Sequence, residues 1–263
     1  MTNSNPVVLI SGAGRGIGAE TARTMGRRGY HVIVNYRSNK AAADGVVSDI
    51  SGAGGTAESQ QADVTNEDQV NELVQQAFDR HGRIDALICN ANTVDPPFQS
   101  LLSVPWDAFI GKVTGELAGA FFLTRSLLPI MQRSRTGRIV FISSTAADSV
   151  GSTAAHSTAK AALNTFSRHV AAYAAEHGIT VNTVALAMVR TDASSPYISE
   201  ALQTYTQDRS VVGRIMNTVD VATTIAAVAA DEGFRATVGQ VIRVDAGYDV
   251  LDQQLHPTTK FFQ

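Results

Sequence analysis

The chain alternates short apolar runs with longer segments in which apolar residues recur every three or four positions. The short runs have the length of buried strands, and the longer segments have the period of amphipathic helices. Strands are predicted at Val7–Ile10, His31–Asn35, Glu58–Ala62, Ala86–Asn90, Ile139–Ser143, Thr180–Ala185 and Val241–Val244, of which Glu58–Ala62 is the weakest. Helices are predicted at Ile17–Arg28, Lys40–Ser51, Glu67–His81, Trp106–Arg133, Ala159–His177 and Val219–Ala230. The alternation is typical of an α/β protein in which crossover helices join parallel strands.

Capping residues support these boundaries. A glycine follows four of the helices, where a left-handed residue is favoured: Gly29, Gly52, Gly82 and Gly178. Asn66 precedes another helix, and its side chain can accept hydrogen bonds from first-turn amides.

One domain is expected over residues 1–250. Residues 191–215 fit neither period, and a long insertion of this kind favours a substrate lid, with a plain surface excursion as the alternative. Residues 251–263 are expected to form a polar C-terminal tail.

Composition narrows the classes of partner. The 263 residues are 44% hydrophobic, which suffices for one large core. The net charge is −3 and the basic residues are scattered, so nucleic acid is not an expected partner. No signal segment precedes the first strand and no apolar run nears the ~20 residues that span a bilayer, so we expect a cytoplasmic protein that does not contact membranes. The single cysteine, Cys89, excludes an internal disulfide, and no Cys or His cluster along the sequence predicts a metal site.

A glycine-rich loop follows the first strand and leads directly into the first helix. It reads Ser11-Gly12-Ala13-Gly14-Arg15-Gly16-Ile17-Gly18. Between a strand and a helix, such glycines permit a tight turn, backbone approach to a pyrophosphate and close packing of helix on strand. The phosphates then lie at the positive helix end. The context predicts a Rossmann-type, doubly wound parallel sheet of about seven strands, flanked by helices, that binds a nicotinamide dinucleotide.

The end of the second strand indicates which dinucleotide is bound. An acidic residue there would hydrogen-bond the adenosine ribose, whereas a basic residue accommodates a 2′-phosphate. The chain has Tyr36-Arg37-Ser38 at this point and no acid nearby. Arg37 and Ser38, with Arg15 in the glycine loop, offer two cations and a hydroxyl to a phosphate, which favours NADP(H) over NAD(H).

With this loop in place, the chain resembles the short-chain dehydrogenase/reductase family, particularly its 3-oxoacyl-carrier-protein-reductase-like branch. The resemblance covers about residues 6 to 250. Ser11–Gly18 is similar to the family's T-G-x-x-x-G-I-G, Asp63-Val64 to its adenine-contacting D-V element, and residues 137–144 to the strand that carries the catalytic serine, here Ser143. Val244-Asp245-Ala246-Gly247 resembles the C-terminal V-D-G-G.

The active-site motifs depart from the family pattern in four places. His156-Ser157-Thr158-Ala159-Lys160 stands where the family has Y-x-x-x-K, so histidine replaces the tyrosine acid/base. Glu116 replaces the catalytic asparagine in an N-L-x-G-x-F stretch. The N-N-A-G element reads Cys89-Asn90-Ala91-Asn92, and a P-G pair reads Leu186-Ala187.

The resemblance implies a set of cofactor-binding residues. These are Gly12, Gly14, Arg15, Gly16, Ile17, Gly18, Tyr36, Arg37, Ser38, Asp63, Val64, Asn90, Ala91, Lys160, Val189 and Thr191. It implies catalytic roles for Ser143, His156 and Lys160, to which we add Glu116. It also implies a homodimer or homotetramer built on the helices at residues 106–133 and 159–177.

Histidine can replace a tyrosine acid because its ordinary pKa of about 6.5 lies near neutrality. Lys160, one helical turn on, would favour the neutral imidazole, while Glu116 would oppose this by supplying a carboxylate. We therefore expect a coupled Glu, His and Lys network, with a pH inflection between roughly 5.5 and 7.5. The alternative is that His156 only fills the space left by tyrosine.

The leading hypothesis is an NADP(H)-dependent oxidoreductase that acts on a carbonyl or alcohol of a small metabolite. Two alternatives share the fold. One is a lyase, isomerase or cyclase that uses His156 and Glu116 for proton transfer. The other is a catalytically silent dinucleotide-binding protein.

Overall fold

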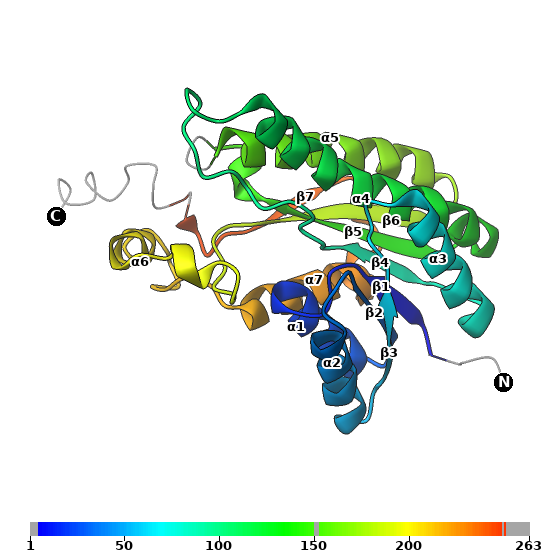
Figure 1. The fold of residues 1–263 in the computed structure, drawn as a ribbon. Helices are drawn as coiled ribbons and strands as arrows, with labels where there is room; N and C mark the ends of the chain where they lie inside the picture. The colour runs from blue at the N-terminus through cyan, green and yellow to red at the C-terminus, as the bar shows by residue number, and fades with distance from the viewer. Residues whose placement is uncertain (1–4, 150–152, 249, 251–263) are drawn as a thin grey trace.

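A computed structural model describes residues 5–149, 153–248 and 250. Its centre is a seven-stranded parallel sheet with the strand order β3-β2-β1-β4-β5-β6-β7 (Figure 1). The strands are β1 (Val7–Ile10), β2 (His31–Tyr36), β3 (Thr56–Gln61), β4 (Ala86–Cys89), β5 (Gly137–Ser144), β6 (Ile179–Leu186) and β7 (Val241–Val244). The order reverses between β1 and β4, and doubly wound sheets bind their ligands at the carboxyl ends of the strands at such a point.

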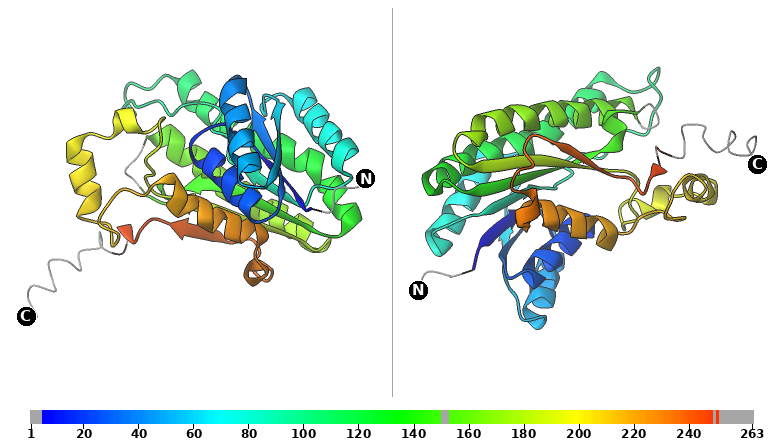
Figure 2. Two further views of the ribbon diagram at one scale, coloured as in Figure 1. Left: turned by 90° about the horizontal axis from the view of Figure 1, so that it is seen from below. Right: turned by 180° about the vertical axis from the view of Figure 1, so that it is seen from behind.

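Helices cover both faces of the sheet (Figures 1 and 2). One layer contains α1 (Gly16–Arg27), α2 (Lys40–Gly52) and α7 (Thr218–Ala230), and the other contains α3 (Glu67–His81), α4 (Trp106–Ser134) and α5 (Ala154–Ala175). Strand β1 is buried on both sides: Val8 and Ile10 pack with the first layer, Val7 and Leu9 with the second. The predicted single-domain, doubly wound Rossmann-type fold is confirmed.

The helix ends show where the capping prediction is right and where it fails. Gly29, Gly82 and Gly178 have the expected left-handed conformation, with φ of +84°, +70° and +73°. Asn66 Oδ1 accepts a hydrogen bond from Gln69 N at 3.1 Å, as predicted. The prediction for Gly52 is wrong, because helix α2 includes Gly52 and the chain turns at Gly54, where φ is +85°.

Two element predictions also need correction. Helix α5 begins at Ala154 instead of Ala159, because Thr153 accepts a hydrogen bond from His156 N and caps the helix one turn earlier. The segment 191–215 contains helix α6 (Glu200–Gln207), which lies away from the main layers in Figure 1. None of its residues is buried, and the helix is only eight residues long. The predicted tail at 251–263 lies outside the described residues.

Candidate active site

The glycine loop makes the tight turn between β1 and α1. Gly12 has a φ of +63°, and a Cβ on it would lie 2.9 Å from the Cα of Ala91. Gly16 has a φ of +57°. A Cβ on Gly18 would lie 2.4 Å from the carbonyl oxygen of Gly12. These three positions therefore require glycine, whereas a Cβ on Gly14 would meet only ordinary contacts with Ala43.

Polar side chains from two neighbouring strands hold this loop in place. Asn90 Nδ2 donates to the carbonyl oxygens of Ser11 and Gly12 at 3.0 and 3.1 Å. The backbone amides of Asn90 and Ala91 both donate to Ser11 Oγ. On the other side, Asn35 Oδ1 accepts from Gly12 N at 3.3 Å. The side chain of Asn90, predicted to bind the cofactor, thus fixes the shape of the loop, and Asn35 shares a role that the sequence analysis did not assign to it.

Helix α1 begins at Gly16, within the glycine loop, and no N-cap side chain accepts a hydrogen bond from its first-turn amides. Arg15 occupies the N-cap position and makes no side-chain cap, and the first turn holds no acidic residue. By contrast, α2, α3, α5, α6 and α7 are capped by the side chains of Asn39, Asn66, Thr153, Ser199 and Asn217. An uncapped, positively polarised helix end behind a glycine turn has the donors that a pyrophosphate needs, so these residues fit the phosphates of a dinucleotide.

The basic residues beside this loop lie on the surface. Arg15, Arg37 and Ser38 are exposed, and Tyr36 is buried under them at the end of β2. Burial favours a higher pKa for Asp63, but hydrogen bonds from Thr65 and the charge of Arg37 outweigh it and lower that pKa. Arg37 therefore lies close enough to Asp63 for their charges to interact.

Three other residues predicted to bind the cofactor, Val64, Val189 and Thr191, lie in the loops that follow β3 and β6. Val64 packs against Gly119 of α4, where a Cβ would lie 2.9 Å from the Val64 Cγ2. Thr191 lies beside Gly16, and Val189 pairs with Met216 in an isolated bridge. The loop after β6 thus reaches the glycine loop, although the two are far apart in sequence.

The candidate catalytic residues come from three elements that meet at the carboxyl end of β5. Ser143 lies in β5, His156 and Lys160 lie in α5, and Glu116 lies in α4. Lys160 Nζ donates to the Ile142 carbonyl oxygen at 2.9 Å and to Glu116 Oε1. Ser143 Oγ makes a long hydrogen bond of 3.5 Å to the carbonyl oxygen of Lys160. These contacts place Ser143 and Lys160 together at the carboxyl ends of the strands, which is also where the glycine loop lies.

A second lysine, which the sequence analysis did not identify, completes this cluster. Lys112 Nζ donates to Glu116 Oε2 at 2.8 Å and to Asn92 Oδ1 at 2.6 Å, and its side chain is fully buried. Burial favours a higher pKa for Glu116, but the two ammonium groups outweigh it and lower that pKa. Burial also lowers the pKa of Lys112, which Glu116 partly offsets. The four-residue spacing of Lys112 and Glu116 is the signal that could have revealed the pair.

His156 stands beside this cluster without a hydrogen bond to it. Its Nδ1 is buried, and no described residue offers that atom a hydrogen bond. Burial, together with the charges of Lys160 and Lys112, lowers the pKa of His156 to about 4, although Glu116 opposes the shift. The imidazole is therefore neutral at neutral pH. Its pKa lies below the range of roughly 5.5 to 7.5 expected from the sequence, because that expectation did not include the burial of His156 or the charge of Lys112.

The expected Glu, His and Lys network is thus a Lys112, Glu116 and Lys160 network in the structure. One carboxylate lies between two cations, and His156 interacts with them through charge rather than through hydrogen bonds. Ser143, which is 3% exposed, and the neutral imidazole of His156 make no hydrogen bond to the carboxylate and ammonium groups of this network.

Comparisons with known proteins agree with the fold and the loop. The short chain dehydrogenase family matches residues 6–201. The chain is 35% identical over 244 residues to a 3-oxoacyl-[acyl-carrier-protein] reductase of Synechocystis sp., covering 92% of this chain and 96% of that protein. It is 35% identical over 255 residues to the versicolorin reductase of Emericella nidulans, covering 92% and 94%. A 3-oxoacyl-[acyl-carrier-protein] reductase of Staphylococcus epidermidis is 31% identical over 245 residues, with 92% and 98% covered.

The chain therefore belongs to the short-chain dehydrogenase/reductase family, a family of oxidoreductases, and its similarity to acyl-carrier-protein reductases confirms the predicted branch. Membership implies a nicotinamide dinucleotide cofactor, which the glycine loop and the α1 terminus fit. Within the described residues, no helix combines the length and hydrophobicity needed to cross a bilayer.

Proposed function

We propose that this protein is an NADP(H)-dependent oxidoreductase that interconverts a carbonyl and an alcohol on a small metabolite. One observation carries the proposal. Ser143 and Lys160 contact each other at the carboxyl ends of the strands, on the same side of the sheet as the glycine loop. A substrate bound there would lie between the dinucleotide and the side chains of Ser143 and His156.

The preference for the phosphorylated dinucleotide rests on charge. Arg15, Arg37 and Ser38 are exposed beside the loop, and Asp63, the nearby carboxylate, already accepts hydrogen bonds from the amide and hydroxyl of Thr65. Arginine binds phosphate through a forked pair of hydrogen bonds. A 2′-phosphate bound here would therefore form ion pairs with Arg15 and Arg37, whereas an unphosphorylated ribose would form neither.

At the nicotinamide end of the cofactor, Ser143 and His156 have separate roles in the proposed reaction. When bound, the dinucleotide supplies or accepts a hydride at the substrate carbon. Ser143 Oγ is free to turn from its long contact with the Lys160 carbonyl and donate to the substrate oxygen. Neutral His156 accepts a proton from an alcohol during oxidation. During reduction it must first take up a proton from solvent, which its pKa of about 4 makes rare at neutral pH.

One observation favours a second candidate, a dinucleotide-binding protein without hydride transfer. The resemblance implies that Lys160 holds the cofactor ribose, yet two of its three donors are used by Glu116 and Ile142. A single donor remains for the ribose. If this weakens the nicotinamide end of the site, the dinucleotide would bind through its phosphates and adenosine alone.

We also propose that two copies associate through the exposed face of α4 and α5. An apolar groove of about 650 Å³ lies between these helices and is lined by Leu117, Phe121, Ala162, Phe166 and their neighbours. Phe121 is 42% exposed in the single chain. This face is the one that the family resemblance assigns to subunit contact.

The segment 191–215, which carries α6 and reaches the glycine loop through Thr191, is proposed as the substrate lid.

Fluorescence titration with NADPH and NADH tests the cofactor preference. NADPH should bind more tightly, and Arg37→Ala should weaken NADPH binding by about 10-fold or more while changing NADH binding little, because a charge-assisted hydrogen bond contributes roughly 1.5–3 kcal/mol. Arg235→Ala, which removes an exposed arginine that pairs with Glu232, is the matched control. Equal affinity for the two cofactors would contradict the preference.

Hydride transfer is tested separately by following NADPH oxidation, and NADP reduction, against a panel of small carbonyl compounds and alcohols. We expect weak turnover on simple 3-oxoacyl thioesters and a stronger response to one member of the panel. Ser143→Ala should reduce that turnover and leave NADPH affinity unchanged. Tight NADPH binding without turnover on any compound would favour the silent binding protein.

A further inference from the structure

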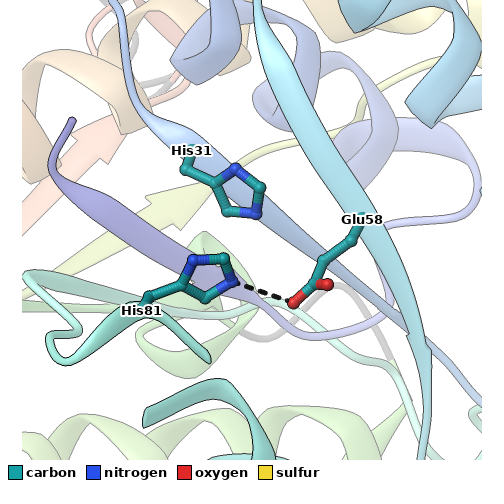
Figure 3. Close-up of side chains that lie close together, drawn as sticks. All are labelled: His31, Glu58 and His81. Carbon is teal, nitrogen blue, oxygen red and sulfur yellow. Dashed lines mark hydrogen bonds and ion pairs between the residues drawn. The ribbon is translucent and has the colours of Figure 1, made fainter. Parts of the chain in front are cut away.

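Two histidines and a glutamate, His31, Glu58 and His81, lie close together (Figure 3). They lie toward the amino ends of β2 and β3, whereas the candidate active site lies at the carboxyl ends of the strands. His31 is the first residue of β2, Glu58 lies in β3, and His81 is the last residue of α3. One potential ligand atom from each side chain lies within 4.8 Å of the other two. The three residues are separated by long stretches of sequence, so no motif reveals them.

The fold explains why these side chains converge. His31 pairs with Thr56 and Ile33 pairs with Glu58 in parallel register, so His31 and Glu58 project from the same face of the sheet. Helix α3 packs on that face and ends at His81, where Gly82 turns the chain in a left-handed conformation. The cluster is thus held by three elements of regular structure.

His31 has a buried nitrogen that the fold leaves unsatisfied. The residue is only 9% exposed, and no described residue hydrogen-bonds its Nε2. A buried polar atom without a partner costs about 1–3 kcal/mol, so such an atom calls for a ligand, an ion or a water. The His31 ring lies beside the His81 ring, with centroids 4.2 Å apart.

Glu58 already faces several groups. His81 Nε2 lies 3.1 Å from Glu58 Oε1, and Gln60 Nε2 donates to the same oxygen at 3.0 Å. Arg80 binds the other oxygen, Oε2, at 2.6 Å. Gln60 and Arg80 therefore orient the carboxylate, as outer-shell groups do around metal ligands, while Oε1 points toward His81.

We propose that His31, Glu58 and His81 bind one divalent transition-metal ion of the zinc class. Two imidazole nitrogens and a carboxylate oxygen form a ligand set that Zn²⁺ prefers, and a water would fill the fourth position. Ligand bonds of about 2.0–2.2 Å place the ligand atoms of a tetrahedral site roughly 3.4 Å apart. The His81 and Glu58 atoms lie 3.1 Å apart, close to this spacing, and the His31 atom, which lies within 4.8 Å of both, would move closer when the ion binds.

Such an ion would have a structural role. It would connect β2, the edge strand β3 and the end of α3, and β3 has only one buried residue, Gln60. Because the ligands lie at the amino ends of the strands, metal binding should leave dinucleotide binding unchanged.

Calorimetric titration of the metal-free, full-length protein with Zn²⁺ tests the site. We expect one ion per chain at micromolar or lower concentrations. His31→Gln and His81→Gln should each weaken binding by at least the roughly 10- to 100-fold that loss of an outer-shell group costs. His177→Gln, which removes a partly exposed histidine paired with Glu176, should bind Zn²⁺ as the wild type does. NADPH affinity provides the check that each variant is folded.

Cobalt absorption gives a readout that requires no variant. Co²⁺ bound to the wild-type protein should show the visible bands of tetrahedral coordination, and Zn²⁺ should displace it. The proposal is overturned if these bands are absent, if Zn²⁺ does not bind, or if His31→Gln binds as tightly as the wild type. In each of those cases the cluster is only an ion pair of Glu58 with Arg80 beside a hydrogen bond between Glu58 and His81.

Discussion

Lys112 Nζ lies 2.8 Å from Glu116 Oε2, one turn away on α4, and neither side chain is more than 4% exposed. Glu116 also binds Lys160 with its other oxygen, so one buried carboxylate neutralises one of two buried ammonium groups. Buried ion pairs add little net stability, but removing one member leaves an uncompensated charge at a high cost. The cluster therefore determines how far the positive charge of Lys160 is offset by Glu116 at the active site.

Glu116→Gln should destabilise the protein by about 3–5 kcal/mol, because it leaves Lys112 and Lys160 buried beside each other without a counter-charge. Adding Lys112→Met should recover much of this loss, since one of the two like charges is then removed. Urea denaturation of the four members of the cycle measures the coupling between the sites.

Glu232→Gln is the control for this cycle. Glu232 is 77% exposed and pairs with Arg138 and Arg235, so its loss should change the free energy of unfolding by less than about 0.5 kcal/mol. If Glu116→Gln were equally mild, the two lysines would have to be neutral or solvated in the folded protein.

The sequence predicted the fold well and the catalytic end of the site only partly. The apolar strands and the glycine loop are local signals, and β1, α1 and Gly18 lie where these signals placed them. His31 has no local signal of this kind, and the four-residue spacing of Lys112 and Glu116 indicates a pair on one helix face without showing that the pair is buried beside Lys160. The importance of His31 and Lys112 depends on burial and on residues distant in sequence, such as Lys160 or Glu58, which only the folded chain brings together.

The pH dependence of stability should report on His156. Its pKa of about 4 in the folded protein lies below the ordinary value of 6.5, so the unfolded chain binds a proton that the folded chain does not between these pH values. Stability should therefore fall as the pH falls from 6.5 toward 4, by up to about 3 kcal/mol from this group.

His156→Phe should lose that contribution and show a shallower fall in stability over the same pH range. Urea midpoints of both proteins, measured in steps between neutral pH and pH 4, provide the comparison. Identical slopes would mean that the folded protein accepts a proton on His156 without penalty.

Self-association should depend on the groove between α4 and α5. Phe121→Asp places a charge on this apolar surface, and the desolvation cost of burying it should convert any dimer or tetramer into monomers. Light scattering after size-exclusion chromatography measures the mass. Phe98→Asp, at an exposed position outside this groove, should leave the mass unchanged. A wild-type protein that is already monomeric would refute the proposed interface.

Replacing His156 with tyrosine should not by itself create an efficient reductase. The resemblance implies that a tyrosine at this position needs the charge of Lys160 to lower its pKa from about 10. Here Glu116 binds the Lys160 ammonium group and partly offsets its charge, so the phenol of His156→Tyr would be a weaker acid than one beside a free ammonium group. The variant should reduce a 3-oxoacyl thioester such as acetoacetyl-coenzyme A no faster than the wild type.

Restoring a free ammonium group on Lys160 should change this result. In the triple variant His156→Tyr, Glu116→Asn, Lys112→Met, the carboxylate is removed together with the second lysine, so no extra buried charge remains. General acid catalysis contributes about 100-fold or more, and the triple variant should exceed the single variant by a factor of that order. NADPH oxidation with acetoacetyl-coenzyme A measures both rates, and the Glu116→Asn, Lys112→Met pair with His156 retained is the control. Ordinary reductase activity in His156→Tyr alone would show that the lysine cluster does not limit the charge of Lys160.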